Sequence, residues 1–105
     1  MKAKRNKVYR VTGKIWLYPG ESANWHFFTI PKKESAKIKQ VFAGLAKGWG
    51  SLPVEVTVEK TTWTTSIFPD SKFGTYILPL KAQVRKKEML YEGDMCTVRF
   101  SIRND

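Results

Sequence analysis

With 105 residues, of which 42% are hydrophobic and 13% aromatic, the sequence has the size and composition of one globular domain and excludes a disordered chain. Its 19 Lys and Arg residues outnumber 9 Asp and Glu residues, and the net charge of +10 favours polyanionic partners. A single cysteine excludes an internal disulfide, and no uncharged run is long enough for a membrane span or a signal peptide. We therefore expect a cytoplasmic protein that does not associate with membranes, present as a monomer or a weak homodimer.

Patterns of hydrophobic residues predict six strands and two helices along the chain. Six of the 19 bases occur in residues 1–14, so residues 1–7 are expected to form a basic, flexible tail before one domain at 8–105. Pro79 is expected to begin a short helix at about 80–88, and a helix at about 34–46 is expected to be amphipathic. The apolar face of this longer helix consists of Ile38, Val41, Phe42 and Leu45. Alternation predicts the strands, at 8–18, 25–30, 54–59, 63–68, 73–78 and 96–102.

This order of elements predicts a mainly β protein whose six strands curl into a small closed or double-split barrel. Closure removes the exposed edges that an open sheet of short strands would leave. Before each helix the sequence repeats a short pattern, once at 28–31 and once at 76–79, which reflects either an internal repeat with pseudo-twofold symmetry or chance. The residues expected to form the barrel core are Val11, Ile15, Val54, Val56, Val58, Val98, Phe100 and Ile102.

Few residues of the sequence are suited to catalysis or metal binding. It has one histidine, His26, and one cysteine, Cys96, and both occur in predicted strands among apolar residues, where packing is the simpler role. Glu92 and Asp94 flank a glycine in a predicted turn, and no spacing typical of a metal site is present. We therefore expect no enzyme activity, no catalytic residue, no metal and no cofactor.

The strongest candidate site surrounds Lys81 and Arg85. If the short helix begins at Pro79, these two bases lie four residues apart on one helix face, close to free backbone N–H groups. Thr65 and Ser66 on a neighbouring strand could add hydroxyl donors, so a small ligand with a phosphate or carboxylate group is the first expected partner. The alternative is that the two bases pair with carboxylates and only hold the helix to the last strand. The three candidate carboxylates are Glu88, Glu92 and Asp94.

Four tryptophans accompany the basic charge of the chain. In a barrel of this size we expect such residues to fill the interior or to cover its ends. The alternative is that exposed rings on a basic surface stack nucleic-acid bases, which makes nucleic acid the second expected partner. The four residues are Trp16, Trp25, Trp49 and Trp63.

The sequence contains a combination of distinctive motifs that extends over nearly the whole chain. They are the run Trp63-x-Thr65-Ser66-x-Phe68-Pro69, the segment from Tyr76 to Ala82, Val84-Arg85-Lys86, Glu92-Gly93-Asp94, Gly13, Trp25-x-Phe27, and Pro31 with its following helix. In these motifs the chain resembles a small prokaryotic family catalogued as a domain of unknown function. The resemblance implies a bacterial protein with a double-split β-barrel, similar to small barrels of antitoxin and transition-regulator type.

The same resemblance implies limits on function. Some relatives carry a C-terminal bacteriocin-protection (YdeI/OmpD-associated) domain, and a role that depends on that domain is not expected of residues 1–105. The family brings no known activity, cofactor or catalytic residue. The expected function is therefore that of a non-enzymatic binding module.

Overall fold

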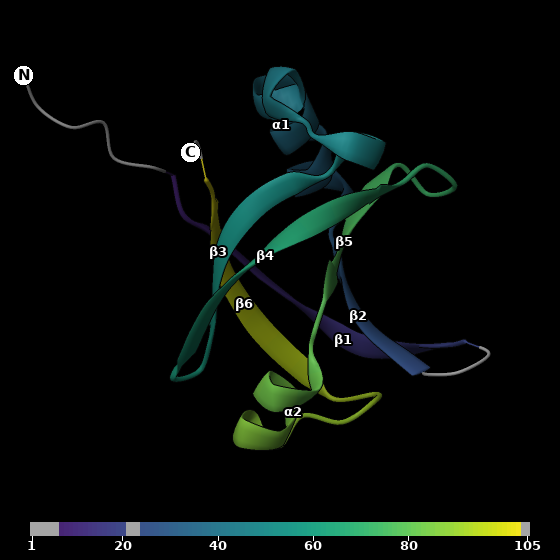
Figure 1. Ribbon diagram of the computed structural model, residues 1–105, viewed down its shortest axis with the longest axis vertical. Helices are drawn as coiled ribbons and strands as arrows, with labels where there is room; N and C mark the ends of the chain where they lie inside the picture. The colour runs from purple at the N-terminus through teal and green to yellow at the C-terminus, as the bar shows by residue number, and fades with distance from the viewer. Residues whose placement is uncertain (1–6, 21–23, 104–105) are drawn as a thin grey trace, which may run out of the picture.

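The structure, a computed structural model, describes residues 7–20 and 24–103, so the predicted tail lies outside the described residues except for Lys7 (Figure 1). Short 3-10 turns, η1 at Ala43–Leu45 and η2 at Gly48–Gly50, follow the first helix. The helices are α1 at Lys32–Phe42 and α2 at Ala82–Glu88. The strands are β1 at Tyr9–Pro19, β2 at Asn24–Ile30, β3 at Leu52–Val58, β4 at Thr61–Asp70, β5 at Thr75–Pro79 and β6 at Met95–Ile102.

The strands form a closed antiparallel barrel in the order β1-β2-β5-β4-β3-β6, which confirms the predicted mainly β class. Two strands contribute to both sides of the barrel. In β1, residues 9–14 pair with β6 and residues 15–19 pair with β2. In β4, residues 61–67 pair with β3 and residues 68–70 pair with β5. The wall therefore has two sheets that meet along β1 and β4.

The topology also confirms the internal repeat. The first half of the domain is β1-β2-α1-β3 and the second is β4-β5-α2-β6, and each half is a hairpin, a helix and a strand. The halves associate symmetrically, because β2 pairs with β5 and β3 pairs with β6. Figure 1 shows the consequence: α1 and α2 lie at opposite ends of the barrel, and the β1–β2 and β4–β5 hairpins extend to the same side.

The core fills the inside of the barrel with residues from every strand. All eight residues predicted to form it are buried. Gly13 has a steric role here, because a Cβ at this position would lie 3.3 Å from the ring of Phe28. Phe28 is fully buried, so the missing side chain of Gly13 makes room for it. The eight buried core residues are Val11, Ile15, Val54, Val56, Val58, Val98, Phe100 and Ile102.

The predicted apolar face of the first helix is wrong in part. Val41 is 67% exposed, because α1 packs on the barrel through a narrower strip, and Leu45, which is 39% exposed, lies beyond the end of α1 at Phe42. That strip includes the buried Ser35 and Ile38. The Ser35 hydroxyl donates to the carbonyl of Ile30 at 2.9 Å and accepts from the amide N–H of Tyr76 at 3.0 Å. A buried serine therefore ties α1 to β2 and β5, which a search for apolar residues does not detect.

The second helix begins at Ala82 rather than at Pro79, which corrects the predicted start. Pro79 ends β5, and the amide of Leu80 continues the pairing by donating to the carbonyl of His26 at 2.9 Å. Leu80 is buried in the core, so this residue packs against the barrel instead of beginning the helix. Lys81 consequently precedes the helix in an extended conformation.

The fifth strand begins at Thr75 rather than at Phe73, which is a second correction. The amides of Phe73 and Gly74 donate to the carbonyl of Asp70 and form the turn of the β4–β5 hairpin. The ring of Phe73 is exposed. Within the part of the chain that the structure describes, no helix has the length and apolar character needed to cross a membrane.

Candidate functional site

The outer side of the sheet formed by β1, β2, β5 and β4 is concave and aromatic. Its hollow has a volume of about 540 Å³ and lies between the β1–β2 and β4–β5 hairpins. We call it the aromatic cleft. The residues that line it are Trp16, Tyr18, Trp25, Phe27, Phe68, Pro69, Asp70, Ser71, Ile77 and Pro79.

Cross-strand contacts hold the rings of the aromatic cleft in place. Trp16 lies opposite Phe27 in the β1–β2 register, with ring centroids 5.1 Å apart. The indole N–H of Trp16 donates to the hydroxyl of Thr29 at 2.8 Å, which satisfies its polar atom. The rings of Trp25 and Phe27 are nearly parallel, at 9°, with centroids 6.3 Å apart. Trp25 is 54% exposed and Tyr18 58% exposed, so the cleft offers aromatic surface to a ligand.

A second, cationic hollow adjoins the aromatic cleft. It has a volume of about 250 Å³, and Trp25 and Pro79 line both hollows. Lys81 and Arg85, the two bases predicted to form an anion site, line it together. Its remaining lining residues are Asn24, His26, Leu80 and Ala82.

Arg85 is anchored by the backbone and not by an acid. Its Nε donates to the carbonyl of Leu80 at 2.9 Å, and no ion pair with a carboxylate is found for it among the described residues. Two of the three carboxylates proposed as alternative partners have other contacts. Glu88 accepts from the Thr61 hydroxyl and from the Lys60 amide, and Asp94 accepts from the amide of Tyr91.

The two hydroxyl residues of the predicted site lie elsewhere. Thr65 and Ser66 are on β4, opposite Val54 and Pro53 of β3, and neither lines the cationic hollow. Because they are successive residues of a strand, their side chains point to opposite sides of the sheet. Of the predicted set, the structure therefore brings Lys81 and Arg85 together and does not bring Thr65 and Ser66 to them; the anion site itself stays a prediction.

The one histidine and the one cysteine of the chain both have shifted pKa values. Burial lowers the pKa of His26 below its usual 6.5, and the charge of Arg85 lowers it further, against an opposing effect of Glu92. Burial raises the pKa of the Cys96 thiol to about 11, with Asp94 and then Glu59 adding to the effect. Near neutral pH the imidazole is therefore uncharged and the thiol protonated. The described residues contain no group of three or more His, Cys, Asp and Glu side chains that could hold a metal ion.

The expectation that the tryptophans fill the barrel or cover its ends holds for Trp63 only in part and does not describe the other three. Trp63 packs, partly buried, against the core. Trp16 and Trp25 line the outer cleft, and Trp49 is 92% exposed in the turn that follows α1, with a left-handed φ of 64°. Successive side chains of a strand point to opposite sides of the sheet. Trp16 and Tyr18 on β1 therefore share the outer side, and so do Trp25 and Phe27 on β2. Alternation in the sequence already indicates the outer side for these rings.

With this geometry established, the chain can be compared with known proteins. Residues 12–100 match the family described as Domain of unknown function (DUF1905). The chain belongs to this family. The match supports the resemblance inferred from the sequence motifs, and it includes every residue of the aromatic cleft and of the cationic hollow. No curated protein matches the chain.

Proposed function

We propose that this DUF1905 domain is a non-enzymatic binding module whose ligand combines a flat ring with an anionic group. The ring would stack in the aromatic cleft, and the anion would lie at Lys81 and Arg85. The observation that supports this proposal is that the two hollows adjoin, because Trp25 and Pro79 line both. A single ligand of modest size can therefore contact rings and cations together.

The aromatic side of the proposal rests on exposed apolar surface. A cluster of large rings in contact with water is unfavourable for a free domain, and such clusters commonly mark binding sites. Trp25 and Tyr18 are more than half exposed, although they lie directly opposite each other on β1 and β2. A flat ligand that covers them removes this surface from water and gains ring–ring contacts.

The cationic side rests on how Arg85 is held. Its Nε bond to the Leu80 carbonyl fixes the guanidinium group while leaving its charge without a carboxylate among the described residues. A guanidinium group held in this way is suited to phosphate or carboxylate, which it can bind with two parallel hydrogen bonds. Lys81 is exposed beside it and adds a second positive charge.

Three compounds test the proposal. 1-Naphthyl phosphate has both parts of the expected ligand, 1-naphthol has only the ring, and inorganic phosphate has only the anion. A saturating ligand stabilises the fold by mass action, by about 2.7 kcal/mol at a hundredfold excess over Kd. We expect a rise in Tm with 1-naphthyl phosphate and much smaller rises with 1-naphthol or inorganic phosphate.

Variants locate the effect on the surface of the domain. Trp25→Ala and Arg85→Ala should each reduce the rise in Tm, whereas Trp49→Ala and Arg99→Ala, which are matched changes outside both hollows, should preserve it. Equal protection by inorganic phosphate and 1-naphthyl phosphate would contradict the proposal. So would equal losses in the cleft variants and in their matched controls.

A further inference from the structure

The aromatic cleft extends beyond the space that one small ligand needs. At the end opposite to the cationic hollow it adjoins a third hollow of about 370 Å³, and Pro69, Asp70 and Ser71 line both. This third hollow is bounded by α1, which contributes Lys39 and Gln40. Because the middle hollow shares lining residues with each of the other two, we treat the three together as one groove, whose ends lie near α2 and α1. These two helices lie at opposite ends of the barrel (Figure 1).

We propose that this groove binds a single strand of nucleic acid, with bases stacked on the rings of the aromatic cleft and backbone phosphates at the cations of its ends. The inference rests on the proposed function and specifies its ligand. A mononucleotide would fill the part of the groove near α2. A strand of several nucleotides would continue across the cleft to the third hollow.

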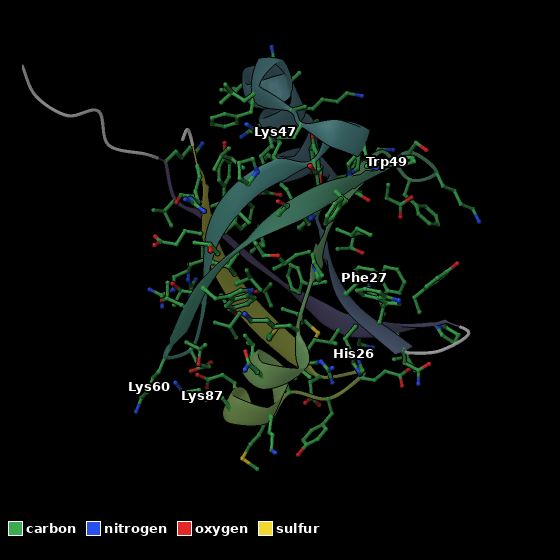
Figure 2. All side chains as sticks on the ribbon, in the orientation of Figure 1. His26, Phe27, Lys47, Trp49, Lys60 and Lys87 are labelled. Atoms are coloured by element: carbon green, nitrogen blue, oxygen red, sulfur yellow. The ribbon has the colours of Figure 1, made fainter. Side chains whose placement is uncertain are left out.

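The ring geometry matches a row of bases. Trp25 and Phe27 are two residues apart on β2, with nearly parallel rings whose centroids are 6.3 Å apart. This separation is the ordinary spacing of residues i and i+2 on a strand, so the two rings form a row along the outer side of β2. Figure 2 shows how β2 is placed for this: Phe27 lies between the two hairpins, and the neighbouring His26 lies toward α2. A strand that follows β2 can therefore meet one ring after another.

The charges match a phosphate backbone at the ends of the groove. Lys81 and Arg85 lie at the α2 end and Lys39 at the α1 end. One carboxylate, Asp70, lines the groove between the cleft and the α1 end, and it suits the amino group of a base better than a phosphate. The net charge of +10 adds long-range attraction for any polyanion.

The same features favour a single strand over a duplex. In a duplex the faces of the bases are covered by their neighbours, so rings such as Trp25 and Phe27 cannot stack on them unless a base is extruded. Sheet surfaces that combine aromatic rings with a cationic path bind single strands through stacking, which is tolerant of sequence. An acidic peptide is the competing occupant, and the experiment below includes one.

Calorimetric titration with unlabelled ligands tests the inference. The ligands are uridine monophosphate, oligouridylates and oligothymidylates up to about 12 nucleotides long, a duplex of the same length and an oligoglutamate. We expect affinity to increase with oligonucleotide length until the groove is filled, at about four nucleotides or more. We also expect binding to weaken steeply with salt and the duplex and oligoglutamate to bind more weakly than the single strands.

Matched variants separate binding in the groove from general attraction to a basic protein. Trp25→Ala should weaken oligonucleotide binding by roughly ten- to a hundredfold if one base stacks on the ring, and Trp25→Phe should recover most of the loss. Trp49→Ala removes an exposed tryptophan outside all three hollows and should leave affinity unchanged. The Tm of each variant shows whether it is folded. We expect Trp25→Ala to fold, because Trp25 is half exposed and little of the core depends on it.

The possible results distinguish this inference from the proposed function. If uridine monophosphate and long oligonucleotides bind equally well, the inference is wrong and the ring-and-anion site stands. If neither the nucleotides nor 1-naphthyl phosphate binds, both are wrong. If Trp25→Ala and Trp49→Ala bind the oligonucleotides as tightly as the unmodified domain, binding is only general charge attraction and the inference is wrong. Tighter binding of the duplex or of the oligoglutamate also overturns it.

Discussion

The barrel wall has two outer faces that differ in chemistry although they share two strands. On the first, formed with β3 and β6, threonines face each other across strands, with hydroxyl oxygens 2.8 Å apart in the pairs Thr12–Thr97 and Thr57–Thr62. We call this the threonine face. On the second, formed with β2 and β5, the outward residues form the aromatic cleft.

The strand β1 shows that the backbone does not impose this difference. It continues from the threonine face into the aromatic cleft with the same alternation, and its outward side chains change from Thr12 to Trp16 and Tyr18. The inward side chains of β1 are buried under both faces, Val11 under the threonine face and Ile15 under the aromatic cleft. Either kind of outer surface is therefore compatible with the barrel, and the binding function proposed above accounts for the rings of the second.

The largest expected effect is the difference in stability between alanine variants of two neighbouring phenylalanines of β2. Phe28 is fully buried and Phe27 points outward into the cleft. Phe28→Ala should reduce the free energy of unfolding by about 3–5 kcal/mol, since it removes a large core side chain. Phe27→Ala should cost less than Phe28→Ala, because it loses about 0.5–1.5 kcal/mol of ring contacts and the burial of a ring that is only half-buried, yet it should weaken ligand binding. Urea unfolding measures both costs, and similar values would mean that the fold requires the aromatic face.

A smaller effect concerns His26, at the cationic end of the groove. Its pKa lies below the usual 6.5 because of burial first and the charge of Arg85 second. The unfolded chain therefore binds the proton more readily than the folded domain. The contribution of the uncharged imidazole to the free energy of unfolding should be full above pH 6.5 and should decrease as the pH falls below it. Denaturant titrations at a series of pH values should show this decrease in the unmodified domain and a smaller one in His26→Gln. An unchanged pH dependence in the variant would show that the imidazole is not responsible.

The smallest effect is expected on the threonine face. Thr57→Ala removes one cross-strand hydroxyl contact, that with Thr62, and should lower the free energy of unfolding by about 0.2–1 kcal/mol. Because Thr57 lines none of the three hollows, 1-naphthyl phosphate and oligonucleotides should bind as before. A loss of affinity comparable to that of Trp25→Ala would mean that ligands use the threonine face.

The sequence was sufficient to predict the barrel because its signals are local. Val54, Val56 and Val58 alternate with polar residues, and this pattern identifies the inner side of β3 without knowledge of its neighbours. The repeat was visible in the same way, as two similar segments before two helices. The start of α2 was not predicted, because the burial of Leu80 and its backbone bond to His26 are tertiary contacts, and they keep Leu80 out of the helix.

The site was predicted only in part, because it depends on contacts between distant segments. Lys81 and Arg85 are close in sequence, and the structure brings them to one hollow. The cleft beside them requires β1 and β4 to change partners between the two sheets, and it requires both hairpins to extend to the same side. No local pattern encodes that arrangement, so the outward rings of Trp16 and Trp25 could be placed on a strand face from the sequence but not assembled into a cleft.

The most direct test of the account uses the indole N–H signals of the four tryptophans in a ¹⁵N–¹H NMR titration with oligouridylate. Trp16 and Trp25 line the aromatic cleft, whereas Trp49 and Trp63 lie outside it and serve as controls in the same spectrum. We predict that the signals of Trp16 and Trp25 shift as the ligand is added and that those of Trp49 and Trp63 do not. Shifts confined to Trp49, or equal at all four residues, would contradict a binding site in the aromatic cleft.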